Sequence, residues 1–207
     1  MRTRASATAA ALVAVVLTAG GCMEGDGTSP GSTASASPTA SPTASPTEDP
    51  SPATPSDAGS DAPFGDPATT STADPGTGAA LTVTGIRVAT HDGYDRVVFD
   101  LGGVGTPGWR VEYVDEALDD ASGNHVDVAG GAVLRVVISG TGVPMDTGVQ
   151  EYAGTTVSVS RGAVQQVVYR FVFEGYTTAF VGVDQQRPFR VFTLDDPTRL
   201  VVDVENG

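Results

Sequence analysis

The chain has 207 residues, with 11 basic side chains, 25 acidic ones and a formal net charge of −14. Every basic residue is an arginine, and so acidic a chain repels phosphate backbones, which argues against nucleic-acid partners. A single cysteine excludes an internal disulfide, so a hydrophobic core alone must stabilise whatever part of the chain folds.

Residues 1–21 have the three parts of a secretory signal peptide. Arg2 and Arg4 give a positive start, and an apolar stretch follows from Ala5 to Leu17. This stretch is too short to cross a bilayer as a helix. The small residues Ala19 to Gly21 then precede Cys22, which predicts cleavage directly before the cysteine.

A cysteine in this position resembles the lipobox of bacterial lipoproteins. The resemblance implies that Cys22 carries acyl chains such as palmitate and becomes the first residue of the mature protein. The chain would then be held by lipid at the outer face of the cytoplasmic membrane. The alternative is an ordinary secreted protein with one free thiol.

Residues 22–78 are rich in Ser, Thr, Ala and Pro, and include a four-residue repeat between Ser37 and Thr47. Such a segment has too little apolar surface to offset the entropy of ordering, which predicts a disordered tether. Its acidic side chains have no basic partners within it, so charge repulsion extends it further.

Residues 79–207 contain the alternating patterns that predict a single β domain. Apolar residues recur at every second position in segments such as 97–101, 134–138 and 200–204. This period is typical of antiparallel strands with one face on a core, and predicts a small β-sandwich or an open barrel. We expect turns at Asp92-Gly93 and Asp196-Pro197, a two-residue hairpin turn at Gly130-Gly131, and at most a short helix over 115–121.

Two of the expected strands have similar sequences. Residues 96–101 and 199–204 both read Arg, apolar, Val, apolar, Asp, apolar. Antiparallel neighbours centred on Val98 and Val201 would place each Arg opposite the Asp of the other strand, on the face away from the core. We expect two exposed cross-strand ion pairs in that case. In the alternative, the segments are symmetry mates in different sheets.

These segments also carry a family resemblance. The stretches 94–101 and 189–204, above all Pro197-Thr-Arg-Leu-Val-Val-Asp203, are similar to the strand motifs of AMIN domains, and best to the AMIN-like lipoproteins of high-G+C Gram-positive bacteria. The resemblance implies a β-sandwich over residues 79–207. It also implies a non-enzymatic module that targets the cell envelope and binds peptidoglycan.

The residues themselves offer little chemistry. His91 and His125 adjoin expected turns and lack metal-ligand spacing, and no serine has the surroundings of a nucleophile. The acidic segment 115–127 lacks the spacing of a calcium loop and is interpreted as a solvated loop. We therefore predict no catalytic residue, no metal and no cofactor.

A binding surface is the remaining hypothesis. The single tryptophan, Trp109, follows an expected turn and lies either in the core or at a rim, where Arg110, Tyr113 and Tyr176 could join it as ligand-binding residues. Peptidoglycan or another wall-associated partner is the expected ligand. The alternative is an accessory lipoprotein that binds another envelope protein through an edge strand and has no glycan ligand.

Overall fold

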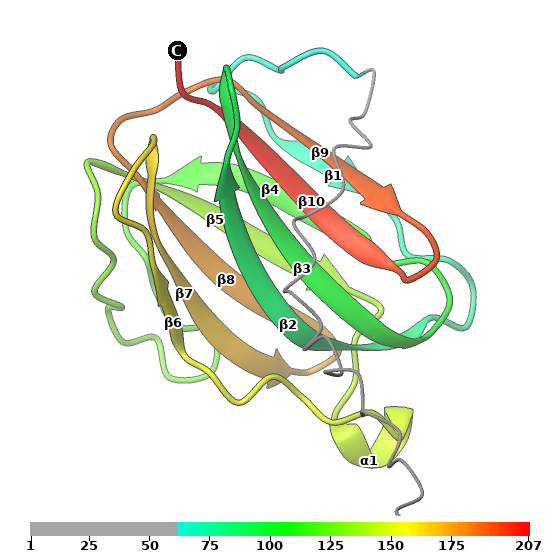
Figure 1. Cartoon of the computed structure of the whole chain (residues 1–207). Coiled ribbons are helices and arrows are strands. Elements are labelled where there is room, and N and C mark those ends of the chain that lie inside the picture. Colours follow the sequence, from blue (N-terminus) through cyan, green and yellow to red (C-terminus); the bar gives the residue numbers. More distant parts are fainter. Residues whose placement is uncertain (1–61) are drawn as a thin grey trace, which may run out of the picture. The chain divides into compact units, whose positions relative to one another are not determined.

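A computed structural model describes residues 62–207 (Figure 1). The expected signal peptide, Cys22 and residues 22–61 of the expected tether lie outside the described residues. The described part consists of two antiparallel sheets and one short helix, which confirms the all-β sandwich. No helix within residues 62–207 is long and apolar enough to cross a membrane.

The smaller sheet has four strands in the order β2-β3-β10-β9. Their bounds are Ala80–Thr90 for β2, Tyr94–Val104 for β3, Phe189–Leu194 for β9 and Arg199–Glu205 for β10. The expected turns at Asp92-Gly93 and Asp196-Pro197 connect β2 to β3 and β9 to β10. This sheet therefore contains both strands that share the Arg-to-Asp sequence pattern.

The larger sheet has six strands in the order β1-β4-β5-β8-β7-β6. Their bounds are Ser71–Ala73 for β1, Gly108–Val114 for β4, Ala132–Ser139 for β5, Thr156–Ser158 for β6, Val164–Phe173 for β7 and Tyr176–Val183 for β8. The helix α1 spans Pro144–Thr147 in the connection between β5 and β6.

The core lies between the two sheets, as the alternation predicts. Val97 and Phe99 of β3 and Val202 of β10 face Leu134 and Val136 of β5, and all five side chains are fully buried. Because the side chains of a strand alternate between its faces, the remaining residues of each strand lie on the outer faces. Any site on this fold must therefore be built on an outer face, an edge or a loop.

The predicted register of β3 and β10 is confirmed. The two strands are antiparallel neighbours, with Arg96 opposite Asp203 and Val98 opposite Val201. The Arg96 guanidinium makes two hydrogen bonds to the Asp203 carboxylate, at 2.7 Å from Nε and 3.0 Å from Nη2. The expectation of an exposed pair is wrong, because both side chains are 0% exposed. Arg190 of β9 donates a further hydrogen bond to the same carboxylate, at 2.9 Å.

The second expected ion pair does not form, although Asp100 and Arg199 are opposite each other. Asp100 instead accepts hydrogen bonds from Arg87 of β2, at 2.9 Å from Nε and 2.6 Å from Nη2. A register shift in β2 places Gly85 opposite Asp100, so no side chain stands between that carboxylate and Arg87. Arg199 turns to the backbone carbonyl of Pro197, at 3.0 Å from its Nε.

The predictions for residues 115–131 need correction. This segment forms an irregular loop from β4 to β5 and contains no helix. Gly130-Gly131 does not form a hairpin turn, because no strand precedes it. The Gly131 N–H instead donates to the carbonyl of Val183, at 2.8 Å, where an added Cβ on Gly130 would meet backbone atoms of Val183 at 2.7 Å. The glycines allow the loop to approach β8 closely.

The folded part also begins before Ala79. Strand β1 pairs with β4, with Ser71 opposite Val111, and Gly65 donates to the carbonyl of Phe189 at 2.8 Å. Short polar segments of this kind contribute backbone hydrogen bonds and little apolar area. The hydrophobic pattern of the sequence therefore gives no sign of them.

Candidate functional site

The β7–β8 hairpin carries two exposed aromatic side chains at its end. Its turn is Glu174-Gly175, with φ of 50° at Glu174 and 83° at Gly175. Positive φ at both central residues is typical of the two-residue hairpin turn whose twist matches that of the strands. The turn places Phe173 and Tyr176 opposite each other, and they are 42% and 53% exposed.

Part of the outer face of the six-stranded sheet is covered by the loop 115–131. Ala117 and Val126 of the loop pack on Phe180 of β8 and Val168 of β7 and form a small second core. Tyr176 lies outside this covered part, towards the end of β8 at which the hairpin turn is located. The loop therefore buries one end of this face and leaves the aromatic end open to solvent.

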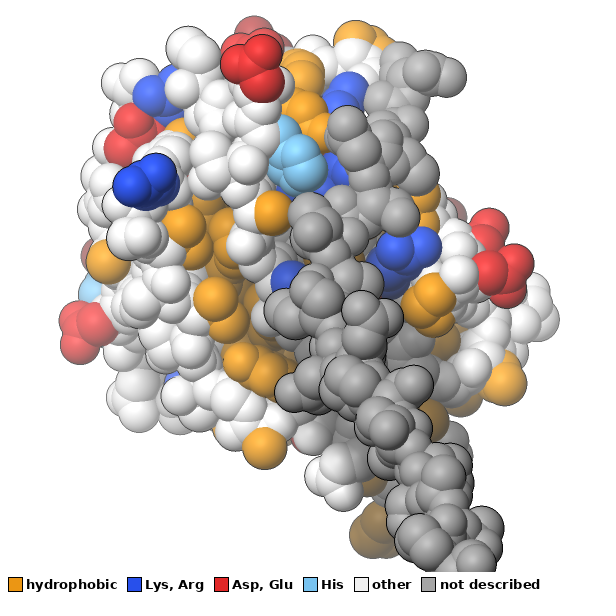
Figure 2. Space-filling view, in the orientation of Figure 1, with side chains coloured by type: hydrophobic (Ala, Val, Ile, Leu, Met, Phe, Trp, Pro, Cys, Tyr) orange, Lys and Arg blue, Asp and Glu red, His pale blue; other side chains and the backbone are white. Residues whose placement is uncertain are grey.

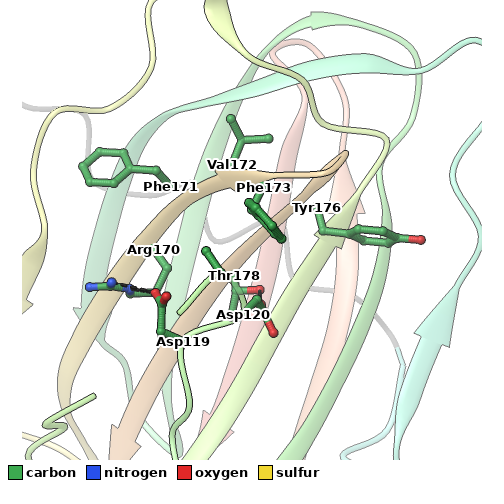
Figure 3. A pocket seen from close by; sticks show the side chains of 9 residues that line it. Asp119, Asp120, Arg170, Phe171, Val172, Phe173, Tyr176 and Thr178 are labelled. Carbon is green, nitrogen blue, oxygen red and sulfur yellow. Dashed lines mark hydrogen bonds and ion pairs between the residues drawn. The ribbon is translucent and has the colours of Figure 1, made fainter. Parts of the chain in front are cut away.

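The open end contains a hollow of about 350 Å³, which we name the Tyr176 groove. Six of its lining residues come from four segments of the chain: Arg110, Asp120, Arg135, Phe173, Glu174 and Tyr176. The hollow continues on both sides of Tyr176. One neighbour, of about 310 Å³, reaches β1, and the other, of about 190 Å³, lies along β7 (Figure 3).

The arginines of this surface are each held by a carboxylate. Arg110 donates to Glu112 at 2.8 Å from Nε and 2.7 Å from Nη2. The hydrogen bond from Arg110 lowers the pKa of Glu112, and the same contact raises the pKa of Arg110. The Thr70 hydroxyl donates to Oε2 of Glu112 at 3.0 Å, the oxygen that also accepts from Nη2 of Arg110, and helps to fix the carboxylate in place.

Asp119 and Asp120 attach the loop to the open end of the sheet. Asp120 accepts hydrogen bonds from Arg135 and, at 2.5 Å, from the Thr178 hydroxyl. Asp119 accepts from Arg170 at 2.7 Å, as Figure 3 shows, and from the hydroxyl and N–H of Ser122. Hydrogen bonds from Ser122, followed by that from Arg170, lower the pKa of Asp119 to about 2.

These carboxylates are committed to protein partners. Among residues 62–207 no group of three or more His, Cys, Asp or Glu side chains is arranged to hold a metal ion. Exposed aromatic rings beside fixed hydrogen-bonding groups are suited to binding a ligand through stacking and hydrogen bonds. This surface therefore offers exposed rings for stacking and fixed groups for hydrogen bonding.

The structure brings three of the four predicted ligand-binding residues together. Arg110 and Tyr176 line the groove, and Trp109 lines the neighbouring hollow with them. The Trp109 side chain is partly buried and packs against the core, with Nε1 donating to the Ser71 hydroxyl at 3.1 Å. Trp109 therefore contacts the core and also lines a surface hollow, so it combines the core and rim positions.

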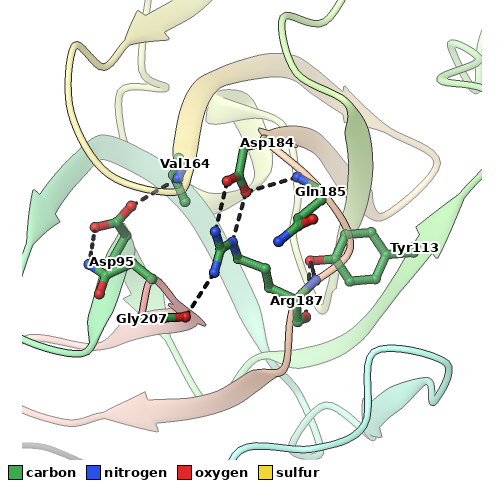
Figure 4. Close-up of polar contacts among 8 residues, drawn as sticks. Asp95, Tyr113, Val164, Asp184, Gln185, Arg187 and Gly207 are labelled. Atoms are coloured by element: carbon green, nitrogen blue, oxygen red, sulfur yellow. Dashed lines mark hydrogen bonds and ion pairs between the residues drawn. The ribbon is translucent and has the colours of Figure 1, made fainter.

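Tyr113 is the predicted residue that the structure separates from the others. Its ring meets Phe189 edge-on at 5.9 Å in the core. Its hydroxyl donates to the carbonyl of Arg187 at 3.1 Å and accepts from the N–H of the same residue at 3.0 Å (Figure 4). Burial raises the pKa of Tyr113. This tyrosine holds the β8–β9 connection against the sheet.

Sequence reasoning missed Phe173, Glu174, Arg135 and Asp120 as members of one surface. The sequence did contain one sign of the hairpin. Glu174-Gly175 lies between two segments with strand-like composition, and glycine at the second position of a two-residue loop is typical of a tight hairpin turn. Asp120 and Arg135 come together only through the loop 115–131. No local pattern in the sequence indicates where that loop crosses the sheet.

Part of the family motif serves the fold rather than the groove. The buried carboxylate of Asp95 accepts hydrogen bonds from the N–H of Val164, at 2.9 Å, and from the amide of Asn206, at 2.8 Å (Figure 4). It thereby joins β3, the start of β7 and the end of the described chain. Asp95, like Asp203, is fully buried and hydrogen-bonded, which identifies both motif acids as structural.

No curated protein and no solved structure matches the chain. The family model of the AMIN-like domain matches residues 81–206, which is more than half of the chain. Such domains are generally non-catalytic, cell-wall-related binding modules of the extracytoplasmic envelope, and no enzyme family is indicated. The matched range begins at the second residue of β2 and ends just after β10, so it includes both sheets except for β1. The chain belongs to the AMIN-like domain family.

Proposed function

We propose that this protein is a lipid-anchored, extracytoplasmic module that binds peptidoglycan through the Tyr176 groove. The observation that carries the proposal is the open aromatic end of the six-stranded sheet. There Phe173 and Tyr176 are exposed beside arginines whose guanidinium groups are fixed by Glu112 and Asp120. Fixed polar groups around an aromatic surface lose little conformational entropy when a ligand binds.

The charges of the surface support a wall ligand rather than a nucleic acid. Figure 2 shows the side of the four-stranded sheet, opposite to the groove, and there the described arginine and acidic side chains are interspersed without a continuous basic patch. Phosphate backbones are bound through clusters of unpaired Lys and Arg. In the groove, by contrast, Arg110 and Arg135 already hold carboxylates.

Anchoring follows from Cys22, which lies outside the described residues. In this proposal its acyl chains hold the module at the outer face of the cytoplasmic membrane, because the chain has no lysine and no polybasic second signal. Residues 22–61 then act as the spacer that allows the folded part to reach the wall.

Co-sedimentation with purified peptidoglycan tests the proposal. We expect the soluble chain with Cys22→Ser to sediment with the wall and to be released when muramidase digests it. Tyr176→Ala and Arg110→Ala should both weaken sedimentation. Arg161→Ala, which removes an exposed arginine outside the groove, should have no effect. Wall binding that none of the groove substitutions changes would refute the site.

A specific observation also favours the second candidate, a protein partner bound at a sheet edge. Strand β9 lies at an edge of its sheet. The Phe189 carbonyl accepts a hydrogen bond from Gly65, which shows that the backbone groups of Phe189 point away from β10. The backbone groups of Val191 and Thr193 point the same way, and no partner for them is present among residues 62–207. Such an edge can add a strand from another protein.

Thr193→Pro distinguishes the two candidates. The substitution removes an outward N–H that does not bond to β10, so the sheet retains its hydrogen bonds. Wall binding through the groove should not change. If crosslinking in the native envelope yields a specific protein partner that Thr193→Pro abolishes, while purified wall is not bound, the second candidate replaces the first.

A further inference from the structure

The Tyr176 groove has a feature that a purely structural hairpin does not need. Glu174 has a φ of 50°, a conformation in which Gly and Asn are favoured and a glutamate is strained. Strain that persists at an exposed turn is often associated with a functional role of the side chain. The Glu174 side chain lines the groove between Phe173 and Tyr176.

The charges that line the groove disfavour an anionic ligand. Arg110 and Arg135 are balanced by Asp120 and Glu174, and Glu112 adds a further negative charge beside them. The whole chain carries a net charge of −14. Free carboxylates, such as those of the peptide stems of peptidoglycan, are therefore repelled by this surface.

The shape of the surface favours a chain-like ligand. The three hollows meet at Tyr176 and together cross the sheet from β1 to β7, perpendicular to the strands. Two exposed rings lie side by side on this path, Phe173 and Tyr176, which are opposite each other in the β7–β8 hairpin. A ligand that follows the path meets the rings of Phe173 and Tyr176 together with the carboxylate of Glu174.

We propose that the groove recognises the sugar chain of peptidoglycan rather than its peptide stems, and that Glu174 is a ligand-binding residue. The inference rests on the proposed function. The apolar faces of the sugar rings lie on Phe173 and Tyr176. The carboxylate of Glu174 accepts hydrogen bonds from sugar hydroxyls or from the N–H of an acetamido group, and these are uncharged donors that an acidic surface attracts without a counter-ion.

Competition experiments test the ligand. The soluble chain is sedimented with intact peptidoglycan and with glycan strands that an amidase has stripped of peptides, after the lactyl carboxylates that the amidase exposes have been converted to neutral amides. Sedimentation with intact peptidoglycan is repeated in the presence of N-acetylglucosamine tetramer or free stem peptides. We expect binding to the stripped strands and competition by the sugar tetramer alone. Loss of binding after stripping, or competition by stem peptides, overturns this inference but leaves the proposed function intact. Absence of binding to intact peptidoglycan overturns both.

Glu174→Asn tests the role of the side chain. Asparagine suits the backbone conformation but is too short to reach the same position, so stability and binding should change in opposite directions. We expect a higher unfolding midpoint together with affinity for glycan strands that is about tenfold lower. Met145→Ala, at a residue 93% exposed on α1, is the control and should change neither. A Glu174→Asn chain that is more stable and binds as tightly as before refutes the role of Glu174.

Discussion

Removal of Asp203 should destabilise the domain far more than removal of a surface charge. The Asp203 side chain is 0% exposed and accepts hydrogen bonds from Arg96, at 2.7 and 3.0 Å, and from Arg190, at 2.9 Å. Asp203→Leu leaves two guanidinium groups without this carboxylate in a water-poor environment. Breaking a buried pair in this way costs about 3–5 kcal/mol. An exposed pair, as the sequence pattern alone predicts, would contribute only about 0.2–1 kcal/mol.

Urea unfolding, followed by circular dichroism, measures the difference. We expect Asp203→Leu to lower the free energy of unfolding by about 3–5 kcal/mol. Arg199 lies at the other end of β10 and corresponds to Arg96 in the shared sequence pattern. Arg199→Ala should change the free energy of unfolding by less than about 0.5 kcal/mol. A loss below about 1 kcal/mol for Asp203→Leu would refute the buried network and restore the surface-pair interpretation.

Three other predictions concern the anchor, the boundary and the loop. Cys22→Ser should abolish lipid labelling and release the protein into the medium or leave its signal peptide uncut; a processed, membrane-retained variant would contradict the lipobox. A chain beginning at Ala62 should unfold at higher urea than one beginning at Ala79, because only the longer chain keeps β1 and the bond from Gly65 to Phe189; equal midpoints would contradict this boundary. The pKa of Asp119, about 2 in the folded state, is below its unfolded value, so this group's stabilisation is complete above about pH 4 and is lost as the pH falls towards 2. Asp119→Asn should flatten the pH dependence of stability in that window, and an unchanged slope would contradict the contacts of Asp119 with Ser122 and Arg170.

The fold was predictable where hydrophobic alternation is strong. The segments 97–101 and 200–204 carry apolar residues at every second position, and their charges predicted the register of β3 and β10 because only one antiparallel alignment places Arg96 opposite Asp203. Burial of that pair was not predictable. The sequence pattern of a strand does not reveal what covers the outer face of its sheet. Charged residues on that face are therefore predicted to be exposed.

The site was predictable only in part, for a related reason. Tyr176 and Arg110 are recognisable as exposed residues on strands, but the groove depends on contacts between distant segments. Asp120 reaches the Arg135 side chain through an irregular loop, and Trp109 lies on the core side of the strand from which Arg110 points outwards. Side-chain parity along a strand can be read from sequence, but the path of a loop across a sheet cannot.

The most direct test of the central claim is to map the ligand on the fold by NMR. The soluble chain with Cys22→Ser, labelled with ¹⁵N, is titrated with soluble glycan strands. The proposed function predicts that the largest amide shifts occur at Phe173 to Tyr176 and at Arg110 and Arg135. Shifts confined to Val191 and Thr193, or spread evenly over the domain, would contradict the claim that the Tyr176 groove is the binding site.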